Sequence, residues 1–138
     1  MARDKYHFQF RQALEKENWH VTHDSFDFSI GEVDFEIDLG AEQILAAEKE
    51  GRVIAIEIKS FLEDSPVSAF HKAMGQYGNY LVGLSFYDPS RKLYLAIPDA
   101  IYNTFFQRPF VRLICKMKSI KIITFDPQTE TIIQWIEN

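Results

Sequence analysis

Cysteine is almost absent from this sequence, and its scarcity excludes two kinds of structure. The single cysteine, Cys115, cannot form a disulfide within the chain, and it cannot build a zinc cluster of several thiolates. We therefore expect Cys115 to be a small apolar side chain in the core.

Long apolar runs are also missing. The longest stretch without a charged residue, 73–87, has 15 residues, and a membrane span needs about 20. The first six residues include Arg3, Asp4 and Lys5, where a signal peptide would be apolar. These features predict a cytoplasmic protein that does not enter a membrane.

Positive charge is in deficit as well. The chain has 15 lysines and arginines against 20 aspartates and glutamates, which gives a net charge of −5. General affinity for nucleic acid comes largely from cations that neutralise phosphates, so this balance argues against tight independent binding to DNA. The objection is mild, because a bound divalent cation offsets the negative charge of an acidic metal site.

What is present is typical of a folded protein. Hydrophobic residues make up 46% of the 138 residues and charged residues 25%, and domains most often have about 100 to 150 residues. The sequence contains no internal repeat, low-complexity tract or linker. We expect one domain that spans residues 1–138.

Apolar periodicity predicts the order of the elements. An amphipathic helix at the start is followed by several antiparallel strands, a long helix that begins at Ser65 and Pro66, another strand, two short helices and a terminal strand pair. This order predicts an α/β fold of three layers, in which helices flank a mixed central sheet. The expected ranges are 4–18, 19–22, 26–30, 33–39, 43–49 (strand or helix), 53–59, 65–85, 92–97, 98–106, 110–118, 120–125 and 131–136.

Glu57 and Lys59 stand at the end of an apolar run, 53–56. Side chains alternate between the faces of a strand, so these two project to the same side. Glutamate and lysine two residues apart are also common on exposed strand faces, where they have no function. Here the strand is apolar on both faces, as a central strand is, so charges at its end need partners or a function.

A carboxylate on a neighbouring strand would complete a cation site, and Asp38 is the next-to-last residue of the expected strand 33–39. Two carboxylates can hold a hard cation such as Mg²⁺ or Mn²⁺. Lys59 would then supply a fixed positive charge for the nucleophile or for the charge that develops during phosphodiester cleavage.

Glu42 is an alternative to Asp38 as the second carboxylate. If residues 50–51 form a tight turn, Glu42 faces Lys59, and Asp38 lies about 13 Å further along the strand. A kink at Gly40 would bring Asp38 back. Both carboxylates are therefore candidate metal ligands.

Gln76 lies on the long helix, away from its apolar stripe. An exposed amide is the ordinary interpretation of such a residue. However, Gly75 and Gly78 cost about 1 kcal/mol each inside a helix, which suggests that they approach another part of the molecule closely. Gln76 is thus a candidate for orienting water or phosphate.

Several segments together resemble the XisH proteins, the fdxN element excision controlling factors. They are IDLGAE (37–42), AAEK (46–49), IAIEIKSF (54–61), GQY (75–77), LYLA (93–96), FDP (125–127) and QWI (134–136). The resemblance covers nearly the whole chain.

The resemblance implies a restriction-endonuclease-like fold of the PD-(D/E)XK type. Asp38, Glu57 and Lys59 fall on the catalytic pattern of that superfamily, and Gln76 falls on a helix position that often assists. The Ile58 carbonyl is available as a further metal ligand. The implied partners are a small XisI-like protein, DNA and a site-specific recombinase, and a second copy of the chain is a candidate partner.

Two functions of different classes follow. In the first, the protein is a divalent-metal-dependent DNA endonuclease or nickase that acts in the excision of a DNA element. In the second, it is a catalytically silent regulator that binds a XisI-type partner and directs a recombinase, because a fold does not fix a function.

Overall fold

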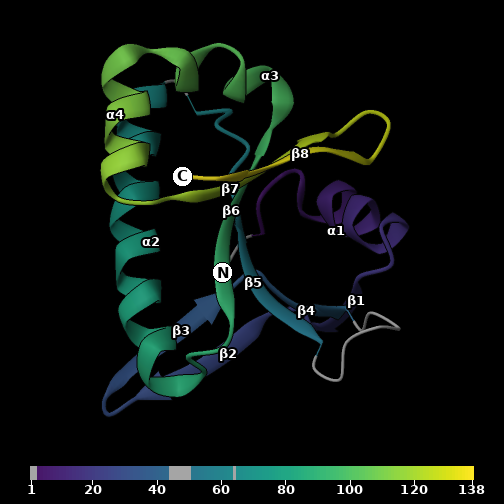
Figure 1. The fold of residues 1–138 in the computed structure, drawn as a ribbon, viewed down its shortest axis with the longest axis vertical. Helices are drawn as coiled ribbons and strands as arrows, with labels where there is room; N and C mark the ends of the chain where they lie inside the picture. Colours follow the sequence, from purple (N-terminus) through teal and green to yellow (C-terminus); the bar gives the residue numbers. More distant parts are fainter. Residues whose placement is uncertain (1–2, 44–50, 64) are drawn as a thin grey trace.

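The computed structural model describes residues 3–43, 51–63 and 65–138, and these residues form a mixed α/β fold (Figure 1). The elements are α1 (His7–Lys16), β1 (His20–His23), β2 (Phe26–Ile30), β3 (Val33–Ile37), β4 (Leu39–Gln43), β5 (Arg52–Ile58), α2 (Pro66–Tyr87), β6 (Lys92–Pro98), α3 (Asp99–Tyr102), the 3₁₀ helix η1 (Phe105–Gln107), α4 (Pro109–Met117), β7 (Lys121–Asp126) and β8 (Thr131–Glu137).

The main sheet is mixed, as the order of elements predicted. Its six strands lie in the order β1-β4-β5-β6-β7-β8, and β2 and β3 form a separate two-stranded sheet. The strand β6 pairs in parallel with β5 and with β7, whereas the β1/β4, β4/β5 and β7/β8 pairs are antiparallel. The helix α1 lies on one side of this sheet, and α2 and α4 lie on the other (Figure 1).

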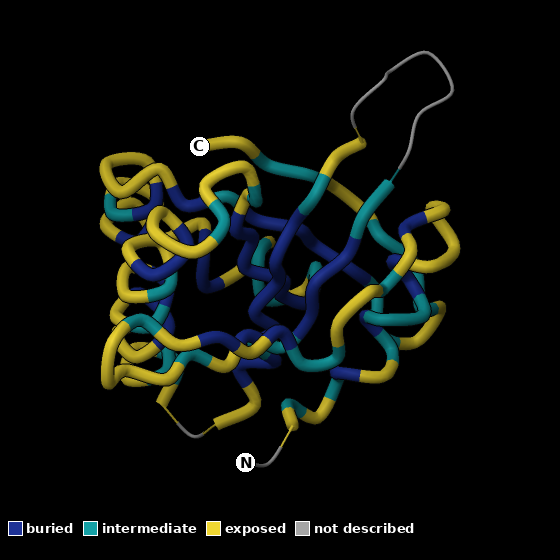
Figure 2. The backbone as a smooth tube through the Cα atoms, turned by 90° about the horizontal axis from the view of Figure 1, so that it is seen from below, coloured by how far each residue is buried: buried dark blue, intermediate teal, exposed yellow. Residues whose placement is uncertain are grey.

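Two hydrophobic cores fill the two sides of the main sheet, because alternate residues of its strands point in opposite directions. Ile54 and Ile56 of β5 pack in the core that contains Phe10 of α1, whereas Ala55 belongs to the core that contains Tyr77 of α2. Figure 2 shows the buried backbone running through the middle of the molecule.

The long helix begins where the sequence predicted. The Ser65 side chain accepts a hydrogen bond of 3.2 Å from the Ser68 N–H, and Pro66 is the first helical residue. Tyr77 then fixes the helix to the sheet, because its hydroxyl donates to the Leu93 carbonyl (2.9 Å) and accepts from the Lys121 N–H (3.0 Å).

Residues 33–39 do not form one strand, and this prediction was wrong. The chain bends at Asp38, so that β3 pairs with β2 while β4 joins the main sheet. Packing outweighs the alternating pattern at this point. A side chain at Gly40 would place its Cβ 2.8 Å from the Phe26 ring, so the β2–β3 hairpin packs closely against β4 only because residue 40 is glycine.

Two helices are shorter than predicted. The helix α1 starts at His7, because the Asp4 carboxylate accepts hydrogen bonds from the N–H groups of Tyr6 and Ser60 and holds residues 4–6 in a turn. The helix expected at 98–106 divides into α3 and η1. Between them the Thr104 hydroxyl donates to the Ala100 carbonyl (2.7 Å), which competes with continued helix.

Cys115 is buried, as expected. Within the described ranges, none of the helices has both the length and the apolar character that crossing a bilayer requires. The predicted turn at Glu50 falls on residues 44–50, which lie outside the described part of the chain.

Candidate functional site

Glu57 lies near the end of β5, and Lys59 follows directly after this strand. Glu57 is only 7% exposed, although it carries a carboxyl group. Its Oε2 atom lies 3.5 Å from Lys59 Nζ, so the two side chains project to the same side and form an ion pair. The strand end therefore presents a buried carboxyl group with a cation beside it.

Asp38 joins this pair because of the register between β4 and β5. Leu39 pairs with Ile56, which places the preceding residue, Asp38, beside Glu57. Asp38 Oδ2 accepts a hydrogen bond of 2.7 Å from the Ile58 N–H, and the Asp38 N–H donates to Glu57 Oε1 over 3.4 Å. The bend between β3 and β4 thus holds Asp38 against the end of β5.

Glu42 is not brought to the site. It pairs with Val53, four residues before Glu57, which corresponds to about 13 Å along a strand. The expectation that Glu42 faces Lys59 was wrong, because the observed register between β4 and β5 differs from the one that a turn at residues 50–51 would give. Of the two candidate carboxylates, Asp38 is the one that accompanies Glu57.

The electrostatics of the pair follow from burial. Desolvation, together with the nearby charge of Asp38, raises the pKa of Glu57 to about 8, and Lys59 opposes this increase. Burial also raises the pKa of Asp38, against the opposing effect of the Ile58 N–H. Two carboxyl groups in contact do not both ionise readily, so the pair retains a proton at neutral pH. A bound cation would offset the negative charge of both carboxylates, so the pair would release this proton.

The donor set fits a hard cation that keeps much of its own water. In the described parts of the chain, no group of three or more His, Cys, Asp or Glu side chains could hold a metal ion. Mg²⁺ commonly uses one or two carboxylates together with water and phosphate oxygens. Asp38 and Glu57 supply the two carboxylates, and water and phosphate would complete the set. The Ile58 N–H already contacts Asp38, and its carbonyl remains a predicted third ligand.

Gln76 lies on α2, and its Oε1 atom is buried without a hydrogen-bond partner among the described residues. Tyr80, one turn further along the helix, was missed by the sequence reasoning. Burial raises the pKa of Tyr80, with contributions from the charges of Glu57 and Asp38, so its hydroxyl lies within the field of the carboxyl pair. The four-residue spacing from Gln76 was the available signal.

The glycines beside Gln76 do not mark a close approach, and this expectation was wrong. An added Cβ would meet nothing within 4 Å at Gly75 or at Gly78. The close contact on α2 is at Gly83, where a Cβ would lie 2.7 Å from the Phe35 ring of β3.

His7 is a second residue whose position the sequence did not reveal. It is buried, its Nε2 atom lies 2.8 Å from Asp24 Oδ1, and its charge influences the pKa of Asp38. Arg11 also contacts Asp24, over 2.8 Å. No spacing in the sequence connects these residues with Asp38, because they lie on α1 and on the loop after β1.

Comparison with known proteins decides the family. The family model described as XisH protein matches residues 1–133. The chain belongs to the XisH family. Among curated proteins, none matches it.

Two solved structures are similar to this XisH protein over almost their whole length. An XisH family protein from Nostoc punctiforme PCC 73102 is 39% identical, with a TM-score of 0.87 and coverage of 97% of this chain and 100% of that one. A fdxN element excision controlling factor protein from Anabaena variabilis is 38% identical, with a TM-score of 0.86 and coverage of 96% and 98%. The architecture described above is therefore that of the family.

Proposed function

We propose that this XisH protein acts in the control of DNA-element excision and that Asp38, Glu57 and Lys59 form a phosphodiester-cleaving site. The first part rests on the similar protein from Anabaena variabilis, which is named as a fdxN element excision controlling factor. The second rests on one observation, the convergence of two carboxyl groups and a lysine at the end of β5. On this proposal the fold belongs to the restriction-endonuclease-like PD-(D/E)XK type.

Each residue has a definite role in the proposed site. Asp38 and Glu57 would hold Mg²⁺ or Mn²⁺, with the Ile58 carbonyl as a further ligand. A bound divalent cation supplies a Lewis acid and lowers the pKa of a water molecule. The Lys59 ammonium orients that water or stabilises the negative charge that develops on the phosphate. The Gln76 amide, whose oxygen has no partner among the described residues, orients the water or the phosphate.

The test combines metal binding with DNA nicking. We expect Mn²⁺ to bind the wild-type protein in titration calorimetry, and we expect the protein to nick supercoiled plasmid in Mn²⁺. Glu57→Gln and Asp38→Asn should lose both activities. Lys59→Ala should bind Mn²⁺ and nick about 10²-fold more slowly or worse, as expected when one charge-stabilising group is removed.

Lys72→Ala is the matched control for Lys59→Ala, because Lys72 is exposed on α2. This variant should nick at the wild-type rate. Wild-type protein that binds Mn²⁺ but leaves both plasmid and recombination-site DNA intact, alone and with its partner, would disprove cleavage. Failure to bind Mn²⁺ in a folded protein would disprove the metal site itself.

A second candidate function is that of a catalytically silent regulator, and an exposed apolar face on α4 favours it. Phe110, Leu113 and Met117 are 71%, 49% and 77% exposed, and their spacing places them on one side of the helix. Exposed apolar side chains that gather on one face commonly mark a site of protein association. In this function the face binds a XisI-like protein, and the complex directs a site-specific recombinase to DNA. The same face could pair two copies of the chain.

This candidate predicts binding without cleavage. Phe110→Asp combined with Met117→Asp should abolish capture of a purified XisI-like protein, while the double variant should unfold at the wild-type temperature because both side chains are exposed. Sedimentation of the chain alone separates self-association from partner binding. Partner capture that is unchanged in the double variant would exclude this face.

A further inference from the structure

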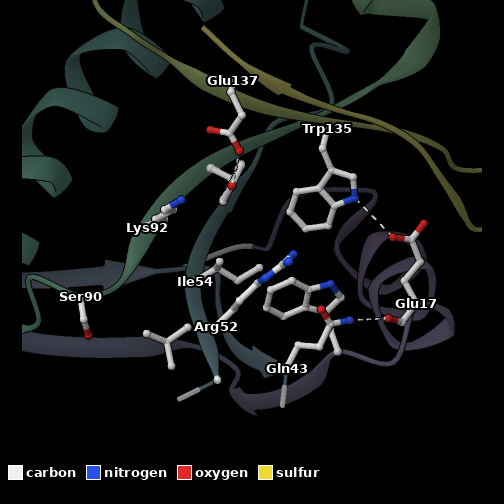
Figure 3. Close-up of a pocket in the computed structure, with 12 residues that line it drawn as sticks. Glu17, Gln43, Arg52, Ile54, Ser90, Lys92, Trp135 and Glu137 are labelled. Atoms are coloured by element: carbon white, nitrogen blue, oxygen red, sulfur yellow. Dashed lines mark hydrogen bonds between the residues drawn. The ribbon is translucent and has the colours of Figure 1, made fainter. Parts of the chain in front are cut away.

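A pocket of about 810 Å³ lies at the end of β5 where Arg52 begins the strand (Figure 3). Arg52 and Ile54 of β5 line it, and Ile54 belongs to the core on the α1 side of the sheet. Glu57 lies five residues beyond Arg52, which corresponds to about 17 Å along a strand. The pocket is therefore separate from the carboxyl pair, and its size falls in the range of small-molecule sites.

One wall of the pocket is aromatic and fixed in position. Trp19 and Trp135 are stacked with their ring centroids 5.6 Å apart, and Tyr94 meets Trp135 edge to face at 5.2 Å. The Trp135 Nε1–H donates to Glu17 Oε1 over 3.3 Å, and the Gln43 side chain donates to the Glu17 carbonyl over 2.9 Å (Figure 3). Trp19 and Tyr94 are only 6% and 5% exposed, so Trp135 is the ring that a planar apolar group can contact, and this ring is already held in position.

The charged side chains that line the pocket are Glu17, Arg52, Lys92 and Glu137, and together with Lys121, which pairs with Glu137, they carry an excess of one positive charge. Glu137 is neutralised by Lys121, whose Nζ lies 3.0 Å away, and it also accepts a hydrogen bond from the Tyr94 hydroxyl. Arg52 and Lys92, the first residues of the parallel strands β5 and β6, have no ion-pair partner within the described ranges. In Figure 3 the Arg52 side chain extends toward Trp135. A ligand with an anionic group can reach these two cations.

We propose that this pocket binds a nucleotide, with the base against the aromatic wall and the phosphate at Arg52 and Lys92. Aromatic side chains that stack on bases, combined with cations that follow the phosphates, are the means by which proteins bind single nucleotides and single strands without reading sequence. The two sources of this ligand are a free mononucleotide and a nucleotide unit within a single strand. Nucleotide binding in this pocket is independent of a metal ion at Asp38 and Glu57.

The two tryptophans of the chain both line the pocket, so intrinsic tryptophan fluorescence reports on it alone. We would titrate the protein in EDTA with adenosine monophosphate, with adenosine and with a short oligodeoxyadenylate, and repeat the titrations by calorimetry. We expect saturable quenching by adenosine monophosphate. Adenosine should bind about tenfold more weakly or worse, because it lacks the charged group that Arg52 and Lys92 contact.

Variants assign the site. Arg52→Ala and Lys92→Ala should each raise the Kd for adenosine monophosphate by about tenfold. Lys72→Ala, the exposed control on α2, and Glu57→Gln should leave this Kd unchanged. Because EDTA is present and Glu57→Gln is a control, failure here is distinct from failure of the metal site.

The oligonucleotide distinguishes the two sources. An oligonucleotide that binds more tightly than adenosine monophosphate, with an affinity that falls as salt rises, would identify a nucleotide within a strand. Equal affinities would identify a free nucleotide, and both results support the proposal. Absence of saturable binding by every nucleotide probe would overturn it. So would equal affinity for adenosine and its monophosphate, or a Kd that both substitutions leave unchanged.

Discussion

Glu57 couples the stability of the protein to pH, and the sign of the effect follows from its pKa. Burial and the charge of Asp38 raise this pKa from an ordinary 4.5 to about 8. Between these two values the folded state binds more protons than the unfolded state, so the free energy of unfolding falls as pH rises from about 4.5 to about 8 in EDTA. Glu57→Gln should flatten this part of the curve and raise the Tm near pH 8 by about 3 °C or more. Calorimetric scans across this pH range measure both effects.

Glu63→Gln provides the control, because Glu63 is exposed and lies just beyond the same strand. It should reproduce the wild-type pH dependence. Wild type and Glu57→Gln that lose stability in parallel between pH 5 and pH 8 would show that Glu57 is ionised in the folded protein throughout.

At the scale of residues, the sequence revealed the site residues that lie on the same face of a single strand. Glu57 and Lys59 are two residues apart on a strand, and their convergence could be predicted from the alternation of side chains. The sequence did not decide between Asp38 and Glu42 as the second carboxylate. The register between two strands depends on the connection that joins them, and a sequence does not fix the length of that connection. Packing of α2 on the sheet brings the Tyr80 hydroxyl within the field of Asp38 and Glu57, and no local pattern encodes this packing.

At the scale of elements, α2 offers a matched test of how closely the β2–β3 hairpin packs against it. An added Cβ at Gly83 would lie 2.7 Å from the Phe35 ring, and that ring is stacked on Phe28 at 4.7 Å. Gly83→Ala should therefore lower the free energy of unfolding by about 1 to 3 kcal/mol. Gly75→Ala in the same helix, where the Cβ meets nothing within 4 Å, should raise it by about 0.5 to 1 kcal/mol. Urea denaturation measures both changes. Two substitutions that both stabilise the protein would mean that Phe35 moves aside.

The elements whose period and caps are local could be predicted closely, and those defined by tertiary contacts could not. The start of α2 follows from Ser65 and Pro66, and β2 has the predicted bounds. The strand expected at 33–39 failed because its alternation continues across Asp38 while the chain passes from one sheet to another. The absence of a side chain at Gly40 leaves room for the β2–β3 hairpin beside β4. Many glycines in strands have no such close neighbour, so Gly40 alone could not predict this packing.

At the scale of the whole molecule, the α/β class and the mixed sheet could be predicted because each helix and strand carries its own apolar period. The pairing of β1 with β4 could not, since it brings together segments about 20 residues apart with another hairpin between them. The aromatic pocket was also missed. Its wall joins Trp19, near the start of the chain, to Trp135, near the end, and only the completed sheet places them together.

Metal binding at the carboxyl pair should stabilise the whole fold, because the two ligands come from different elements and meet only in the folded state. Mn²⁺ at about 100 times its Kd should add about 2.7 kcal/mol to the free energy of unfolding. For a chain of this size that corresponds to an increase in Tm of about 8 °C, which differential scanning calorimetry resolves easily. Glu57→Gln and Asp38→Asn should show no increase, whereas Glu63→Gln should match the wild type.

The increase in Tm caused by Mn²⁺ should also be larger near pH 8 than near pH 6, because the proton that the pair retains must leave before the metal binds. A Tm that does not respond to Mn²⁺ at either pH would mean that Asp38 and Glu57 serve the fold alone.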